Sequence, residues 1–111
     1  MINMLKHHFS CDVDEAKDGV IALKTFETKK KLGESYDLIL LDITMPKLDG
    51  FTLLKQIMRQ DKNATVIMCS SVTNKKIVVE SVRNGAKHFI TKPIEEKDMI
   101  SIIKKVLSKK D

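Results

Sequence analysis

Two stretches of the chain are apolar at almost every position, without the alternation of a strand that has one face in water. They are LILL at 38–41 and ATVIMC at 64–69. An unbroken apolar run of this length is typical of a strand that is buried on both faces, as in a parallel sheet. We therefore predict central strands over 36–42 and 64–69.

Two further segments have weaker strand patterns. Residues 9–14 (FSCDVD) alternate apolar and polar side chains, which predicts a half-exposed edge strand. Residues 88–91 (HFIT) are rich in β-formers and end at Lys92-Pro93, which predicts a short strand.

Four other segments have the composition and boundaries of helices, and we predict helices over 19–32, 50–60, 74–84 and 96–108. Gly33 and Gly85 follow the first and the third of these segments, where glycine commonly ends a helix. Apolar residues recur at helical spacing in the first, second and fourth segments, namely at Val20, Leu23, Phe26, Phe51, Leu54, Ile57, Met58, Met99, Ile102, Ile103, Val106 and Leu107.

Strands and helices therefore alternate along the chain and are joined by short links. This order predicts an α/β domain with a parallel sheet and right-handed crossovers. The 111 residues contain no linker or low-complexity segment, so we expect residues 1–111 to form a single domain with a buried core.

Composition excludes several classes of protein. With 42% hydrophobic and 32% charged residues, the chain is neither disordered nor membrane-spanning, and no apolar stretch is long enough to cross a bilayer. The N-terminus lacks the pattern of a secretory signal. Cys11 and Cys69 are not in metal-binding spacing, so we interpret them as buried free thiols of a cytoplasmic protein.

The net charge of +5 comes from 20 Lys and Arg against 15 Asp and Glu. Much of the excess lies in lysine runs at 29–31 and 104–110, at or near the ends of predicted helices, where cations suit the helix dipole. A nucleic-acid surface usually combines arginines with aromatic residues, but the chain has two Arg, one Tyr and no Trp. The charge pattern favours solvated helix ends over a nucleic-acid partner.

Three polar side chains stand at the ends of successive predicted strands. They are Asp42, Ser70 and Lys92. Each alone has a structural explanation, as a turn cap, a helix N-cap and a surface cation. The carboxyl ends of parallel strands meet at one rim of the sheet, however, and ligands bind there. An acid, a hydroxyl and an ammonium on that rim together favour a functional site.

The chain resembles the receiver domain of two-component response regulators, and in particular the chemotaxis regulators. The segments that carry the resemblance are YDLILLDITMPKLDG, TVIMCSS, GAKHFITKP and DEAKDGVIAL, which together extend over essentially the whole chain. The resemblance implies a flavodoxin-like, doubly wound parallel sheet in three α/β/α layers.

The resemblance also implies a role for individual residues. Asp42 is implied to be the phosphoryl acceptor, Ser70 the hydroxyl that reports phosphorylation, and Lys92 the cation that contacts the phosphoryl group. Phe89 matches the aromatic switch residue. Asp42 and the backbone carbonyl of Thr44 match ligands of Mg²⁺.

The function so implied is a cytoplasmic phosphorelay switch that takes phosphate from a histidine kinase or phosphotransfer domain. Such a domain is regulatory and at most catalyses its own phosphorylation and dephosphorylation. Output would pass through the face formed by residues 74–108, either to a protein partner or by self-association. An alternative is a degenerate receiver that binds proteins without being phosphorylated.

The chain departs from the family at its start. The family's first strand ends in an acidic pair that binds Mg²⁺, whereas the acids of residues 12–15 match the second strand and its exit. We therefore expect the first strand and its acidic pair to be absent, which would weaken Mg²⁺ binding and domain stability. Two explanations stay open: a fragment of a longer reading frame, or a truncated receiver.

Overall fold

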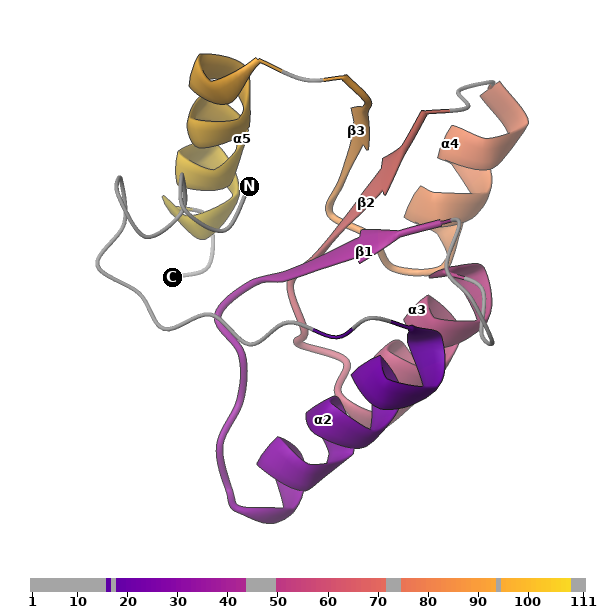
Figure 1. The fold of residues 1–111 in the computed structure, drawn as a ribbon, viewed down its shortest axis with the longest axis vertical. Coiled ribbons are helices and arrows are strands. Elements are labelled where there is room, and N and C mark those ends of the chain that lie inside the picture. The colour runs from indigo at the N-terminus through magenta and orange to yellow at the C-terminus, as the bar shows by residue number, and fades with distance from the viewer. Residues whose placement is uncertain (1–15, 17, 44–49, 72–74, 94, 109–111) are drawn as a thin grey trace.

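A three-stranded parallel sheet with helices on both faces forms the described part of the protein (Figure 1). The computed structural model describes residues 16, 18–43, 50–71, 75–93 and 95–108. Its elements, in chain order, are α2 (Gly19–Lys31), β1 (Ile39–Asp42), α3 (Gly50–Gln60), β2 (Val66–Ser70), α4 (Lys75–Arg83), β3 (His88–Thr91) and α5 (Glu96–Ser108). The predicted α/β fold with a parallel sheet is confirmed.

The strands lie in the order β1-β2-β3, so β2 is the middle strand of the described sheet. β1 pairs with β2 from Ile39↔Val66 to Asp42↔Cys69, and β2 pairs with β3 from Ile67↔His88 to Ser70↔Thr91. Both pairings are parallel, so the three strands end at one rim of the sheet.

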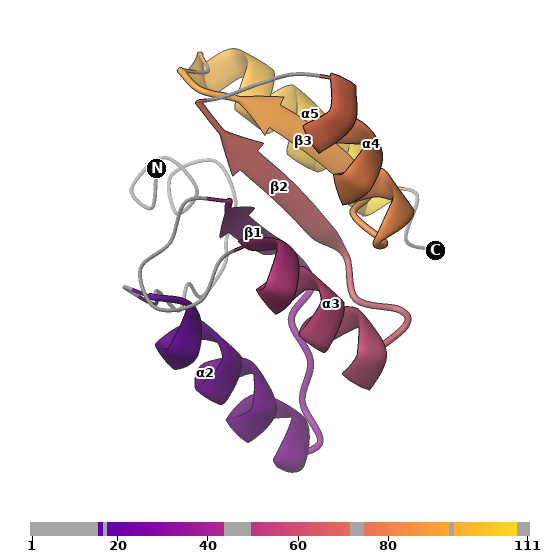
Figure 2. The same cartoon turned by 90° about the vertical axis from the view of Figure 1, so that its right-hand side faces the viewer.

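Apolar side chains fill the space on both faces of β2, which explains its unbroken apolar sequence. Val66 and Met68 point into a core shared with α2 and α3, and Ile67 and Cys69 point into a second core shared with α5. All five residues of β2 are buried. Figure 2 shows α2 and α3 on one side of the strands and α5 behind them.

The helix ends follow from local sequence. Asp18 is the N-cap of α2, and its Oδ1 accepts a hydrogen bond of 2.9 Å from the Ile21 backbone N–H. Gly33 and Gly85 have φ values of +76° and +109°, a conformation in which a Cβ is strained, so glycine suits both positions. The predicted helix ends at these two glycines are confirmed.

One detail of the predicted apolar stripe of α2 is wrong. Phe26 is buried and Leu23 packs against the core, whereas Val20 is 38% exposed. Successive helical residues are rotated by about 100°, so Val20 lies about 120° around the helix from Phe26. The buried face of α2 therefore centres on Phe26 and does not reach Val20.

Some predictions fall on residues outside the described ranges. They are the edge strand at 9–14, the free thiol of Cys11, the carbonyl of Thr44 and the absence of an acidic pair. Among the helices that the structure does describe, none combines the length and the apolar character that a membrane span requires.

Candidate functional site

Asp42 is the last residue of β1 and lies at the carboxyl rim of the sheet. Its backbone is fixed by the β1–β2 pairing, and the next residue, Ile43, donates its N–H to the Cys69 carbonyl at 3.0 Å. The Asp42 side chain is 35% exposed, so its carboxylate is reachable from solvent. The apolar run that precedes Asp42 therefore places a single acid at the end of a buried strand.

Lys92 directly follows β3 and reaches across the end of β2. Its backbone N–H donates to the Ser70 carbonyl at 2.8 Å, and its bond to Pro93 is cis. The Lys92 ammonium contacts Oδ2 of Asp42 as a hydrogen bond and ion pair. Two side chains 50 positions apart in the sequence thus form one charge pair at the rim.

Ser70 ends β2, the strand between those that carry Asp42 and Lys92. It is 3% exposed and lies opposite Thr91 of β3. The three polar residues predicted at strand ends therefore do share one rim, with the acid and the cation in direct contact.

Phe89 lies on β3, separated by β2 from the strand that carries Asp42, and is half-buried. Its ring packs against the core on the α2 and α3 side of the sheet, where Met68 is its neighbour in register. Within the described ranges, no group of three or more His, Cys, Asp and Glu side chains could hold a metal ion. Asp42 is the one predicted metal ligand whose position is described.

Cys69, which the sequence predicted to be a buried free thiol, is confirmed as one and lies beside the Asp42–Lys92 pair. It is the register partner of Asp42 and is 3% exposed. Burial raises the pKa of its thiol to about 11, an increase that the Lys92 ammonium opposes and the Asp42 carboxylate adds to. At neutral pH the thiol is therefore protonated and is not a nucleophile beside Asp42.

We expect Cys69 to react with iodoacetamide far more slowly in the folded than in the urea-unfolded chain at pH 8. The experiment uses a Cys11→Ser background, in which Cys69 is the only thiol.

The raised pKa of Cys69 also predicts how stability depends on pH. The pKa of about 11 in the folded chain exceeds the ordinary value of 9.0, so the free energy of unfolding should be highest below pH 9 and should fall as the pH rises toward 11. Cys69→Ala should flatten that fall in the free energy of unfolding. In the alkylation experiment, equal rates for the folded and the urea-unfolded chain would contradict the buried position of Cys69.

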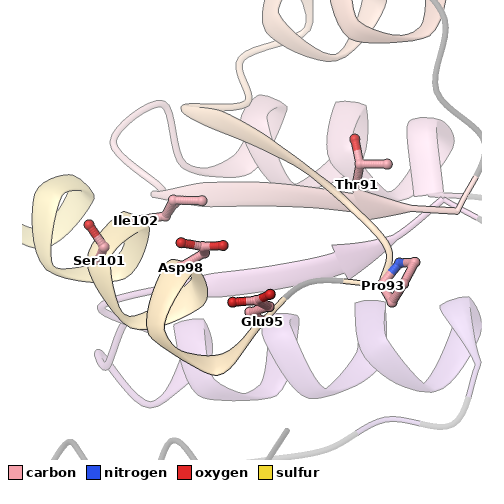
Figure 3. Close-up of a pocket in the computed structure, with 6 residues that line it drawn as sticks. All are labelled: Thr91, Pro93, Glu95, Asp98, Ser101 and Ile102. Carbon is pink, nitrogen blue, oxygen red and sulfur yellow. The ribbon is translucent and has the colours of Figure 1, made fainter.

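A separate hollow of about 560 Å³ lies beside the end of β3 and the start of α5 (Figure 3). Thr91 and Pro93 line one side of it, and α5 and the residue before it contribute the rest, namely Glu95, Asp98, Ser101 and Ile102. The lining does not include Asp42, Ser70 or Lys92. The hollow is therefore distinct from the Asp42–Lys92 pair, although both adjoin the end of β3.

The family model for the response regulator receiver domain matches residues 1–104. The chain belongs to the response regulator receiver family. Receiver domains of this kind are regulatory phosphoacceptors that typically bind Mg²⁺. The resemblance that the sequence motifs suggested is therefore confirmed.

Several relatives of the chain are chemotaxis proteins. The receiver is 40% identical over 93 residues to the chemotaxis protein CheY of Listeria monocytogenes, covering 84% of this chain and 74% of that protein. It is 38% identical over 96 residues to CheY of Bacillus subtilis, covering 86% of this chain and 76% of that protein.

Solved receiver structures have the same fold. A CheY-like receiver domain from Methanospirillum hungatei matches with a TM-score of 0.87 and 25% identity, covering 98% of this chain and 82% of that one. CheY in a CheX–CheY–BeF₃–Mg²⁺ complex from Borrelia burgdorferi matches with a TM-score of 0.83 and 35% identity, covering 95% and 79%. The flavodoxin-like receiver fold implied by the sequence is confirmed.

Proposed function

We propose that this receiver is a cytoplasmic switch that accepts a phosphoryl group on Asp42 from a histidine kinase or a phosphotransfer domain. The observation that carries the proposal is the contact between the Asp42 carboxylate and the Lys92 ammonium at the rim of the sheet. An accessible carboxylate is a competent nucleophile toward phosphorus, provided that a cation offsets the charge of the incoming group.

In the transfer, one carboxylate oxygen of Asp42 forms a bond to phosphorus while the phosphorus–nitrogen bond of the donor phosphohistidine breaks. The electron pair of that bond remains on the donor imidazole, which leaves as a neutral base because its other ring nitrogen carries a proton. The backbone N–H of Lys92 is bonded to the Ser70 carbonyl, which places the Lys92 side chain beside Asp42, where its ammonium can contact the phosphoryl oxygens after transfer. The product is an acyl phosphate on Asp42.

The described part of the site fits one ligand position for Mg²⁺. Asp42 supplies an accessible carboxylate, and Mg²⁺ in proteins often keeps several waters and binds through only one or two carboxylates. When bound, the ion would offset negative charge on the phosphoryl oxygens. The Thr44 carbonyl is proposed as a second ligand.

Phosphorylation would change the balance between two conformations of the domain. The phosphoryl group adds charge and acceptor oxygens, to which the Ser70 hydroxyl and the Lys92 ammonium can donate. Two charge-assisted hydrogen bonds contribute about 3–6 kcal/mol. Changing an equilibrium from 1:99 to 99:1 requires about 5.5 kcal/mol, which lies near the upper end of that range, so a switch built on these two groups is energetically feasible.

The output surface is proposed to lie between residues 74 and 108, with Phe89 as the switch residue. Val79 and Val82 of α4 are 43% and 56% exposed, more apolar surface than a helix with one buried face needs. Phe89 lies on β3, the strand that α4 contacts. We propose that a protein partner, or a second copy of the chain, binds this surface, as the CheX–CheY neighbour exemplifies for another receiver.

Labelling from a small phosphodonor tests the proposal directly. Incubation of the chain with radiolabelled acetyl phosphate and Mg²⁺ should give a base-labile label, and chelation of Mg²⁺ should reduce it strongly. A histidine kinase or phosphotransfer domain should give the same product. If the correctly folded chain takes up no label with either donor, the degenerate-receiver alternative holds and the proposal is wrong.

A further inference from the structure

Gly50 begins α3 and lies directly against the backbone that carries the acceptor. Its N–H donates to the Ile43 carbonyl at 3.0 Å, which bonds the first residue of α3 to the residue after Asp42. Gly50 is buried, as are Leu53 and Leu54 in the next turn of the same helix. The start of α3 is thus pinned both to the core and to the end of β1.

There is no room for a side chain at this position. A Cβ on residue 50 would lie 2.7 Å from the Asp42 carbonyl oxygen and 2.7 Å from the Ile43 Cα, whereas ordinary contacts begin at about 3.4 Å. Both of these neighbours are backbone atoms, so no side-chain rotation can relieve the overlap. Either α3 or the peptide between Asp42 and Ile43 would have to move.

The peptide after Asp42 is tied to β2 by the 3.0 Å hydrogen bond from the Ile43 N–H to the Cys69 carbonyl, so it can yield only by straining that one bond. α3 is held by Leu53, Leu54 and Ile57, which are at most 2% exposed, and a shift of the helix would disturb all of them. The Lys92 N–H is bonded to the Ser70 carbonyl of β2, so the Lys92 backbone would not shift together with the tip of β1, and a displaced Asp42 carboxylate would meet the Lys92 side chain in a different geometry. A side chain at residue 50 would therefore displace Asp42 relative to the Lys92 ammonium.

We infer that Gly50 is a positioning residue of the phosphoryl-transfer site, since its missing side chain fixes where the Asp42 carboxylate stands opposite Lys92. The inference rests on the proposed function of Asp42. It assigns to Gly50 a role in the rate of transfer, beyond allowing the close approach of α3 to the end of β1. Misplacement of a reacting group by about 1 Å can cost about 100-fold in rate, so overlaps of several tenths of an ångström are large on this scale.

Gly50→Ala tests the inference, with Gly33→Ala as its matched control. Gly33 has a φ of +76° and no atom within 4 Å of an added Cβ, so alanine there strains the backbone without touching the site. At a temperature where both variants are fully folded, Gly50→Ala should slow labelling of Asp42 by acetyl phosphate about 10-fold or more and weaken beryllofluoride binding. Gly33→Ala should lower the melting temperature and leave both readouts within twofold of the wild type.

The outcomes separate this inference from the proposed function. If the wild type is labelled and the folded Gly50→Ala variant is labelled at the same rate, only the positioning role of Gly50 is wrong. If the wild type is not labelled, both the positioning role and the proposed function of Asp42 are wrong. If Gly50→Ala does not fold, amide exchange of the wild type decides. The Gly50 N–H should be protected and become more protected with beryllofluoride, and exchange as fast as in an open loop overturns the inference.

Discussion

Replacing Asp42 by asparagine should abolish acyl-phosphate formation from both acetyl phosphate and a phosphorylated kinase. Asparagine has nearly the same shape but no negatively charged oxygen with which to attack phosphorus. Asp42 is the acid that ends β1 and contacts Lys92, so no other described carboxylate is placed to replace it. The measurement is base-labile radiolabel per mole of protein, with mass spectrometry of the wild type to locate the modified residue.

The fold should survive this change. The Asp42–Lys92 pair is partly exposed, with side chains 35% and 39% accessible, and pairs of this kind contribute about 0–1 kcal/mol to stability. Asp61→Asn is a suitable control, because this acid caps the turn after α3 and is not part of the rim. Undiminished label in a folded Asp42→Asn protein would place the acceptor elsewhere.

Replacing Lys92 by alanine should lower the rate of labelling by about 10- to 100-fold and remove the conformational response. A charge-assisted hydrogen bond contributes about 1.5–3 kcal/mol, and each 1.4 kcal/mol corresponds to a factor of ten. Amide exchange with and without beryllofluoride should show changes over α4, β3 and α5 in the wild type. In Lys92→Ala these changes should disappear, while the melting temperature falls by only a few degrees.

Lys97→Ala provides the matched control for this variant. Lys97 lies close by on α5, is 80% exposed, and its ammonium is 3.7 Å from the Glu95 carboxylate, so the same charge is removed from a surface pair. It should label and respond like the wild type. A normal response in Lys92→Ala, or exchange changes confined to α2, would return Lys92 to the role of a surface cation.

Strand and helix types could be predicted because their patterns were strong. The apolar runs at 38–41 and 64–69 lie in or next to strands of the described sheet, and the glycines at 33 and 85 end helices as expected. Boundaries were less exact: the strand predicted over 36–42 covers only Ile39–Asp42, and that over 64–69 is Val66–Ser70. Terminal residues can take extended conformations without pairing, and sequence patterns do not distinguish the two cases.

The rim of the site could be predicted from topology alone. Parallel strands place their carboxyl ends together, and this was enough to group Asp42 with Ser70 and Lys92. The tight fit at Gly50 could not be predicted in the same way, because it depends on how closely α3 approaches β1 in three dimensions. The raised pKa of Cys69 likewise depends on burial, which no local pattern measures.

The hydrogen bond from the Lys92 backbone to the Ser70 carbonyl has a mechanical consequence. It joins the end of β2, at Ser70, to the residue that contacts Asp42, through a bond of 2.8 Å between main-chain atoms. A displacement of β2 at Ser70 is therefore passed to the end of β3 directly, without a relay of side chains. Asp42, the last residue of β1, contacts the ammonium at the end of the same Lys92 side chain. A change of charge at Asp42 on β1 can therefore act on the end of β3 through Lys92.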